Sequence, residues 1–390
     1  MNNVKTLVYV DNFQLEGAAY SQFELTRWLR DNGILEPFVF AGHDGPVQKL
    51  YEEAGIPVFF SAFPDVLPQK GEKYEELLAE LCSRITRQEI KVVYANTSKA
   101  FPAVRAAARC GIPSLWNIRD SEEGTVWPKQ YGERLAQELW SSFSAAGAVV
   151  FVADATQRLF AKWQTKENYY TIHNGLDRKR LERNMAKWQR QSVRQSLGVA
   201  EAELLILSVG TVGERKGQLD LALAMEKLSG ASAEQAHIVL VGAKDDAYGA
   251  RVRAAREQLP EERRRRFHII PETPEAAKYY TAADIFAFCS RNESFPRVIL
   301  EAMACHLPIV TTPVHGVVEQ VVEEENALFY QPGDIEALVR QLERLLGDAE
   351  LRGKFTANSE RVLGRLPNYS QMAQAYGALF LKLAGYEPLQ

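Results

Sequence analysis

Short apolar runs alternate with longer amphipathic stretches along most of the chain. In the first part, runs of strand length lie at residues 6–10, 37–41, 58–60, 92–95, 113–118 and 148–152. Between them, apolar residues recur every three or four positions, as in the leucine-rich stretch 72–88, which predicts helices. Strands that are apolar throughout and separated by helices are typical of a parallel sheet covered on both faces. We therefore predict an α/β fold for this part.

The same alternation starts again after residue 203. Further strands are predicted at 203–210, 237–242, 267–271, 283–290 and 308–312, and helices at 218–228, 335–346 and 370–383. A chain of 390 residues is longer than one ordinary domain. The pattern therefore predicts two α/β domains, residues 1–172 and 173–367, with 368–390 as a final helical segment.

Composition limits the kind of partner. The net charge of −4 argues against a broad nucleic-acid-binding surface. The basic stretch 178–197 and the run 263–266 are interpreted as solvated helix faces, with contact to a membrane surface as the alternative for the first. The four cysteines show no Cys-x-x-Cys spacing, so we expect most to be buried small hydrophobes in a reducing compartment. No signal peptide precedes the first strand, and we expect a cytoplasmic protein, peripheral to a membrane at most.

The stretch 291–301, Arg-Asn-Glu-Ser-Phe-Pro-Arg-Val-Ile-Leu-Glu, joins a buried strand to a helix. Pro296 suits the first helical position, and Ser294 is the candidate cap. The N–H groups of Phe295 and Arg297 would then lie at the positive end of a helix, which favours a phosphate.

Two carboxylates flank this helix start. Glu293 lies in the loop, and Glu301 lies about five residues into the helix, roughly 7.5 Å along its axis from Pro296. Acceptors at that separation suit the hydroxyl groups of a sugar and of a ribose on either side of a diphosphate.

A second element suited to phosphate follows the strand 203–210. Gly210, Gly213 and Gly217 surround Arg215 and Lys216 just before a helix. The order Gly-x4-Gly-Lys-Ser/Thr is missing, which excludes a P-loop nucleoside triphosphatase.

Glu293 and Glu301, with seven residues between them, together with the flanks 307–316 and 325–334, resemble the Glu-x7-Glu region of glycosyltransferase family 4. The resemblance implies the GT-B fold: two Rossmann-like domains with an interdomain cleft, and a C-terminal helix that returns to the first domain. It implies transfer of a sugar, with retention of configuration, from a nucleotide-diphosphate sugar to an acceptor hydroxyl. Such a hexosyltransferase requires neither metal nor cofactor, and its acceptor is a glycan, a lipid-linked molecule or a small molecule. Glycoconjugate or cell-surface polysaccharide synthesis is the expected context.

The resemblance also assigns roles to residues. Glu293 would hold the sugar, Lys216 and Arg215 the diphosphate, and Glu301 the ribose. Residues placed around the donor are Ser294, Phe295, Pro296, Arg297, Gly210, Gly213, Glu272, Thr273 and Gly17, with Glu272 and Thr273 near the base. The family has an arginine where this chain has Thr211, and a second glycine is missing from the loop at Gly17.

The acceptor side is expected in the first domain, where Asn96, Arg119 and Asp120 follow strands. The family often has a histidine near 119–120, which this chain lacks; Arg119 or Asp120 could replace it or form a surface ion pair. His173 to Gly175 is interpreted as a turn that closes this domain.

Two other functions remain open: a nucleotide-sugar epimerase of the same fold, and a sugar-nucleotide-binding protein without catalysis. A dinucleotide-dependent oxidoreductase is excluded, because no Gly-x-Gly-x-x-Gly follows the first strand.

Overall fold

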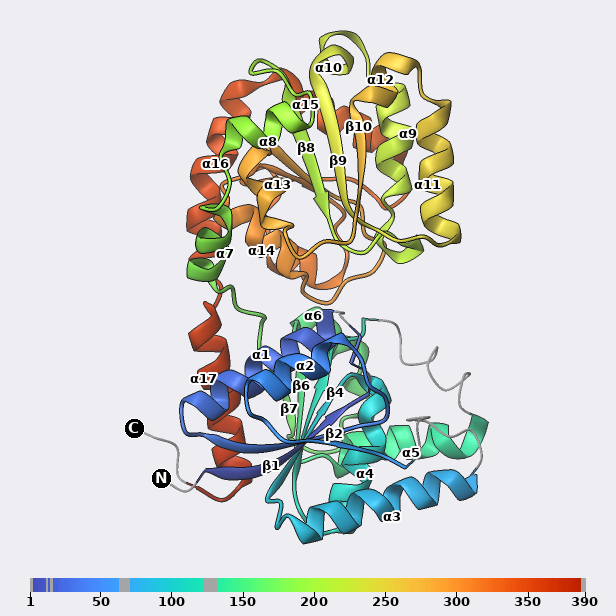
Figure 1. The fold of residues 1–390 in the computed structure, drawn as a ribbon, viewed down its shortest axis with the longest axis vertical. Helices are drawn as coiled ribbons and strands as arrows, with labels where there is room; N and C mark the ends of the chain where they lie inside the picture. The colour runs from blue at the N-terminus through green and yellow to red at the C-terminus, as the bar shows by residue number, and fades with distance from the viewer. Residues whose placement is uncertain (1–2, 12, 15–16, 63–70, 122–131, 387–390) are drawn as a thin grey trace. The chain divides into compact units, whose positions relative to one another are not determined.

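The computed structural model describes residues 3–11, 13–14, 17–62, 71–121 and 132–386. The chain forms two compact units, each built around its own parallel sheet (Figure 1). Unit 1 comprises residues 1–173 and 370–390, and unit 2 comprises residues 174–369.

The sheet of unit 1 has seven parallel strands in the order β3-β2-β1-β4-β5-β6-β7. Their bounds are β1 Val4–Val10, β2 Leu35–Ala41, β3 Val58–Phe60, β4 Val92–Asn96, β5 Ser114–Ile118, β6 Ala148–Phe151 and β7 Tyr169–Thr171. Strands β4, β5 and β6 are buried along their whole length, which explains why apolar residues predominate on both of their faces.

Helices cover both faces of this sheet (Figure 1). On one face lie α3 (Gly71–Arg87), α4 (Phe101–Arg109) and α5 (Gly132–Ala145); on the other lie α1 (Gly17–Asp31), α2 (Pro46–Glu53) and α17 (Tyr369–Leu383). Strand side chains alternate between the two faces. Trp116 of β5 packs on Phe143 of α5, with ring centroids 4.6 Å apart, whereas Tyr94 of β4 packs on Phe380 of α17 at 5.5 Å. Helix α6 (Asp154–Leu159) and the 3₁₀ turns η1 (Ser98–Ala100) and η3 (Ala161–Trp163) complete the described part of unit 1.

The sheet of unit 2 has six parallel strands in the order β10-β9-β8-β11-β12-β13. Their bounds are β8 Leu204–Val209, β9 Ala236–Ala243, β10 Phe267–Pro271, β11 Ile285–Phe288, β12 Ile309–Thr311 and β13 Ala327–Phe329. In both sheets the strand order reverses next to the first strand, between β1 and β4 and between β8 and β11. Ligands of such sheets bind beyond the carboxyl ends of the strands at this reversal.

One face of this sheet is covered by α9 (Leu219–Lys227), α11 (Ala247–Gln258) and α15 (Ile335–Gly347), together with α10 (Gly230–Gln235) and α12 (Glu261–Arg265). The other face carries α13 (Ala277–Ala282) and α14 (Arg297–Ala304), with α7 (Arg178–Met185) and α8 (Arg190–Ser196) packed against them. Helix α16 (Ala349–Leu363) packs on α14 and α15, and η4 (Glu214–Lys216) and η5 (His315–Glu319) are 3₁₀ turns.

The basic stretch 178–197 is not one solvated helix, as the sequence had suggested. It forms α7 and α8, and Arg194 of α8 is buried. Arg194 donates to Asp284 Oδ2 at 2.8 Å, and Arg190 donates to Asp284 Oδ1 at 2.5 Å. The buried guanidinium of Arg194 pairs with the carboxylate of Asp284, just before β11. This ion pair holds α8 against the sheet.

The run 263–266 and the cysteines also differ from expectation. Arg263 donates to the carbonyls of Met225 and Leu228 at the end of α9, because helix carbonyls there lack partners within the helix. Of the four free cysteines, Cys289 is buried and the other three are half-buried. No helix in the described part of the chain is long and apolar enough to cross a membrane.

Candidate functional site

The loops that leave β8 and β11 meet where the strand order of unit 2 reverses. The N–H of Arg291 donates to the carbonyl of Arg215 at 2.8 Å, and Ser290 Oγ donates to the same carbonyl at 3.0 Å. Strands β8 and β11 are neighbours. These contacts therefore join the loop 210–217, called the cation loop because it carries Arg215 and Lys216, to the loop that carries Glu293.

Glu293 is the centre of this arrangement. Its Oε1 accepts from Arg215 Nη1 at 2.7 Å, from Lys216 Nζ at 2.5 Å and from Ser290 Oγ at 3.0 Å. The residue is 7% exposed, so three donors share one desolvated carboxylate oxygen. Burial lowers the pKa of Lys216, whereas the charge of Glu293 acts in the opposite direction and favours the ammonium form. Both predicted diphosphate cations therefore hold an anion that belongs to the protein itself.

A second ion pair supports the cation loop from behind. Arg291 binds Asp220 with two hydrogen bonds, Nη1 to Oδ2 at 3.0 Å and Nη2 to Oδ1 at 2.7 Å. Asp220 is buried in α9, and its hydrogen bond raises the pKa of Arg291. Arg291 lies so close to Gly217 that a Cβ there would stand 1.7 Å from Nη1. Only glycine allows this approach, since the φ of 66° at Gly217 is also left-handed.

Side chains from other segments hold the carbonyls of the loop 290–296. Asn174 Nδ2 donates to the carbonyl of Phe295 at 2.7 Å, and Gln320 Nε2 donates to that of Pro296 at 2.9 Å. Arg215 also donates to the carbonyl of Asn292. The loop is fixed by three separate parts of unit 2, which holds the start of α14 in place beside Glu293.

Helix α14 begins at Arg297, and Pro296 is its N-cap. The ψ of Pro296 is 125°, which is extended, and no side chain caps the helix. The prediction that Pro296 is the first helical residue and Ser294 the cap is therefore wrong. The positive end of the helix still starts at the loop of Glu293.

Glu301 lies further along α14 and contacts α13. Tyr280 Oη donates to Glu301 Oε2 at 3.0 Å. Burial raises the pKa of Glu301, and the charges of Arg297 and Arg180 together with the bond from Tyr280 act against that rise. Sequence reasoning did not find Tyr280 or Arg180.

The residues predicted near the base follow β10. Thr211 Oγ1 donates to Glu272 Oε1 at 3.4 Å, and Thr273 Oγ1 accepts from the N–H of Glu275 at 3.1 Å. Gly210 and Gly242 end β8 and β9 in close contact, since a Cβ on Gly242 would lie 2.4 Å from the carbonyl oxygen of Gly210. Gly213 precedes η4 in an extended conformation.

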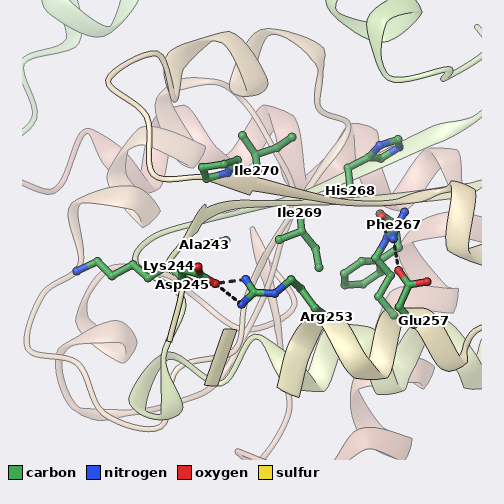
Figure 2. A pocket seen from close by; sticks show the side chains of 11 residues that line it. Ala243, Lys244, Asp245, Arg253, Glu257, Phe267, His268, Ile269 and Ile270 are labelled. Atoms are coloured by element: carbon green, nitrogen blue, oxygen red, sulfur yellow. Dashed lines mark hydrogen bonds and ion pairs between the residues drawn. The ribbon is translucent and has the colours of Figure 1, made fainter. Parts of the chain in front are cut away.

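A hollow of about 740 Å³ lies beside β10, at the edge of this sheet (Figure 2). Arg253 and Glu257 of α11 line it together with Phe267 and Ile269 of β10. Its charges pair locally, as Arg253 does with Asp245 at 2.8 Å. The hollow is two strands away from β8, so the reversal of strand order, and not this hollow, locates the site of unit 2.

In unit 1 the predicted acceptor residues cluster after β4 and β5. Asn96 Oδ1 accepts from Arg119 Nε at 3.0 Å, and Asp120 Oδ2 accepts from the N–H of Ser98 at 3.0 Å. Asn96 Nδ2 donates to the carbonyl of Ala18, next to Gly17 at the start of α1. The structure thus gathers Gly17, Asn96, Arg119 and Asp120 at one edge of the sheet of unit 1. Glu16 lies outside the described residues.

Thr97 of this edge has a strained backbone conformation. It has a φ of 73° and a ψ of 162°, a conformation that is costly for any residue other than glycine. Trp116 Nε1 donates to its carbonyl at 2.7 Å, and its hydroxyl donates to Asp11 Oδ2 at 3.3 Å. These contacts hold the strained residue in place.

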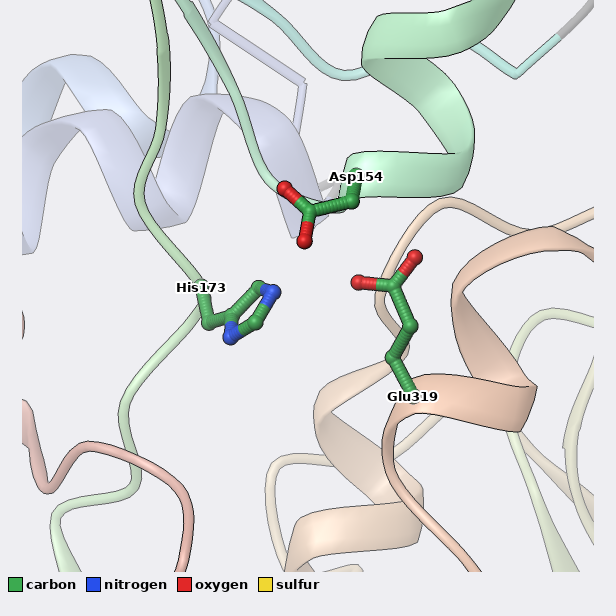
Figure 3. Close-up of side chains that lie close together, drawn as sticks. All are labelled: Asp154, His173 and Glu319. Carbon is green, nitrogen blue, oxygen red and sulfur yellow. The ribbon is translucent and has the colours of Figure 1, made fainter.

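Asp154 and His173 of unit 1 carry side chains that can bind a metal ion. In unit 1, ligand atoms of Asp154, at the start of α6, and of His173 lie within 4.8 Å of each other (Figure 3). Glu319, which Figure 3 also shows, belongs to unit 2. Two ligands do not make up the three or four that a protein metal site uses, so this pair assigns no metal site to unit 1.

The chain is similar to known glycosyltransferases. Residues 189–362 match the family model described as Glycosyl transferases group 1, and residues 15–180 match that of Glycosyltransferase Family 4. The sulfoquinovosyl transferase of Arabidopsis thaliana is 26% identical over 84% of this chain and 63% of its own length. An uncharacterized glycosyltransferase of Methanocaldococcus jannaschii is 24% identical over 65% of each chain. The chain thus spans just under two thirds of these two relatives.

Solved structures show the same fold. HepE of Anabaena in complex with UDP superposes with a TM-score of 0.80 and 21% identity, over 97% of this chain and 100% of that one. A glycosyltransferase of Rickettsia africae superposes with a TM-score of 0.81 and 16% identity, over 98% and 99%. The chain therefore belongs to the family 4-type glycosyltransferases with a GT-B fold. The predicted family and fold class are confirmed.

Proposed function

We propose that this protein transfers a sugar, with retention of configuration, from a nucleotide-diphosphate sugar to an acceptor hydroxyl. One observation carries the proposal: Arg215 and Lys216 converge on Glu293 at the start of α14, where the strand order reverses. Two cations and a helix N-terminus suit a diphosphate. Glu301, further along the same helix, suits the ribose on the nucleoside side.

The chemistry in such a site is mainly electrostatic. When the anomeric C–O bond breaks, negative charge grows on the leaving diphosphate. Lys216 and Arg215 would stabilise that charge in a site with little water, where fixed donors act most strongly. Glu293 would hold sugar hydroxyls and stabilise the positive charge that develops on the sugar ring.

Glu293 and Glu301 are not a glycosidase acid and nucleophile. Those two groups flank a single scissile bond. Here both residues belong to one strand-loop-helix segment, Glu301 is bonded to Tyr280, and Glu293 is bonded to the cation loop. The arrangement favours binding of two parts of one extended donor.

We propose a chemical class for the donor and one for the acceptor. HepE of Anabaena has been solved with UDP and with UDP-glucose, which makes a uridine diphosphate sugar the first donor to test. For the acceptor we propose a glycan, a lipid-linked molecule or a small molecule, approached through the edge of unit 1 that carries Asn96, Arg119 and Asp120. We also propose a cytoplasmic hexosyltransferase, independent of metal and cofactor, that acts in glycoconjugate or cell-surface polysaccharide synthesis.

A thermal-shift titration with UDP, GDP, ADP and dTDP tests the donor site. A nucleotide at 100 times its Kd should add about 2.7 kcal/mol to the free energy of unfolding. We expect one of the four to raise the melting temperature, and we expect Glu301→Ala, which weakens binding of the donor, to reduce that rise. Glu350→Ala, which removes an exposed carboxylate of α16, is the matched control and should keep it.

The outcomes separate the rival functions. No shift with any nucleotide would contradict a donor site in unit 2. A shift followed by interconversion of the nucleotide sugar without any acceptor would instead indicate an epimerase. Binding without turnover of any sugar nucleotide, across a panel of acceptors, would indicate a binding protein.

A further inference from the structure

Tyr280 is buried beneath the donor site of unit 2. It is 2% exposed, and its ring stacks on Phe286 of β11, with centroids 5.9 Å apart and planes 20° from parallel. Its hydroxyl reaches Glu301 Oε2 at 3.0 Å and the carbonyl of Val298 at 3.4 Å. Packing thus fixes the ring, and the hydroxyl is left to contact one oxygen of Glu301.

Glu301 has unequal oxygens as a result. Among the residues that the structure describes, no hydrogen-bond donor contacts Oε1, whereas Tyr280 occupies Oε2. Arg297 and Arg180 are close enough to act on the charge of the carboxylate. The bond from Tyr280 therefore fixes the orientation of a carboxylate on which two positive charges also act.

We propose that Tyr280 is a positioning residue for the donor: its hydroxyl occupies Glu301 Oε2 and thereby presents Oε1 to a ribose hydroxyl of the nucleotide. The inference rests on the proposed function, because it takes the nucleotide ribose as the partner of Glu301. It assigns to Tyr280 an effect on ligands with ribose hydroxyls only, which a merely structural tyrosine would not show.

The test compares nucleotides with and without those hydroxyls. Isothermal titration of the full chain with UDP, GDP and ADP identifies the tightest ligand, and its 2′,3′-dideoxy analogue is the matched ligand. Tyr280→Phe keeps the ring and removes the hydroxyl. We expect it to weaken the ribonucleotide about tenfold, the loss of one hydrogen bond to a charged group, and to leave the dideoxy analogue unchanged.

Tyr279→Phe is the matched control variant. Tyr279 precedes Tyr280 on α13 and is also buried, but within the described part of the chain its hydroxyl has no hydrogen-bond partner. It should bind both ligands as the wild type does. Melting temperatures of the two variants show whether either substitution disturbs the fold.

A double variant gives a second readout. If Tyr280 acts through Glu301, Tyr280→Phe adds no further loss to Glu301→Ala, because coupled residues are not additive. A further tenfold loss in the double variant would overturn the inference.

The pH dependence of binding gives a third readout. The groups acting on Glu301 are Tyr280, Arg297, Arg180 and the nearby Cys305. The bond from Tyr280 lowers the pKa of Glu301, so its removal raises that pKa. Ribonucleotide binding should then be lost at a higher pH on acidification in Tyr280→Phe than in the wild type.

Two results of the titration of Tyr280→Phe would also overturn the proposal. Equal weakening of the ribonucleotide and the dideoxy analogue would show a structural role, and unchanged affinity for both would show no role. In either case the proposed function stands, since the wild type binds. If no nucleotide binds the wild type, the proposed function and this inference fail together.

Discussion

Glu293 is the shared partner of the two cationic side chains in the loop that follows β8. Its Oε1 holds both Arg215 and Lys216. The same cations are the proposed partners of the diphosphate, so the donor competes with a carboxylate of the protein for them. Once the proposed diphosphate binds Arg215 and Lys216, Glu293 would become available to bind the hydroxyls of the sugar. The exchange would couple binding of the diphosphate to recognition of the sugar.

This exchange predicts an unusual effect for Glu293→Gln. Removal of the carboxylate charge frees the two cations, so a nucleoside diphosphate should bind about tenfold more tightly, which is about 1.4 kcal/mol. Cleavage of the full donor should fall at the same time. Titration calorimetry with the diphosphate measures the first effect, and release of free sugar measures the second.

Glu350→Gln is the control for this prediction. Glu350 is an exposed carboxylate of α16, away from the candidate site. It should leave the affinity for the diphosphate within about twofold. A weaker affinity in Glu293→Gln than in the wild type would show that Glu293 assists, rather than opposes, binding of the diphosphate.

Single residues of the site were predictable only where a motif carried them. Glu293, Glu301 and Lys216 occupy positions of a recognised pattern, and the structure brings Glu293 and Lys216 into contact. Asp220 and Arg291 form an equally definite pair, yet they lie 71 positions apart and match no motif. Two charged residues so far apart are indistinguishable, in sequence, from two solvated ones.

At the scale of elements, the turn η4 depends on one glycine. Gly217 ends it with a φ of 66°, and its missing side chain leaves room for Arg291. The turn therefore tolerates neither a different backbone conformation nor added volume. This requirement links the cation loop to the loop of Glu293 through backbone geometry as well as through charge.

Gly217→Ala should destabilise the protein by about 2 to 4 kcal/mol, since strain and a steric clash add. Gly198→Ala is a matched control. Gly198 has the same φ of 66°, and nothing lies within 4 Å of a Cβ there, so only strain of about 1 kcal/mol applies. Urea unfolding of both variants measures the difference. Equal losses would show that Arg291 and the carbonyl of Cys289, which would lie 2.3 Å from the same Cβ, both give way without cost.

Apolar runs predicted the strands better than periodicity predicted the helices. The strands β1, β4, β6, β9 and β10 lie within one or two residues of their predicted ranges. Helix α5 was not predicted, although Leu135, Leu139 and Phe143 recur every four residues and are buried. Strand β13 was not predicted, although β3 and β12, which also have three residues, were. The stretch 178–197 forms two helices, and Arg190 and Arg194 of the second one bind Asp284.

At the scale of the whole molecule, the last residues of the chain belong to the same compact unit as the first ones. Helix α17 packs on the sheet of unit 1: Phe380 contacts Tyr94, and a Cβ on Gly377 would meet Ile34 at 2.8 Å. Unit 1 therefore completes its core with residues that follow the whole of unit 2 in sequence.

This arrangement predicts where a loss of packing is felt. Phe380→Ala should destabilise unit 1 by about 3 to 5 kcal/mol, because it removes a fully buried ring. Hydrogen exchange should quicken in β1, β4 and β5 but not in β8 or β9. Phe355→Ala, a fully buried phenylalanine of α16, is the control and should show the reverse. Faster exchange in β8 alone after Phe380→Ala would contradict the assignment of α17 to unit 1.

The sequence by itself determined the class of the protein. Apolar runs and amphipathic periods specify strands and helices locally, and their alternation specifies parallel sheets. Motifs with fixed spacing identified the family and predicted Glu293, Glu301 and Lys216 as residues of its site. Only the tertiary structure decided that Glu293 holds both cations, that Arg291 and Asp220 support them, and that Tyr280 contacts Glu301. These contacts join positions distant in the chain, and the folding of the sheet, not any local period, brings them within hydrogen-bonding distance.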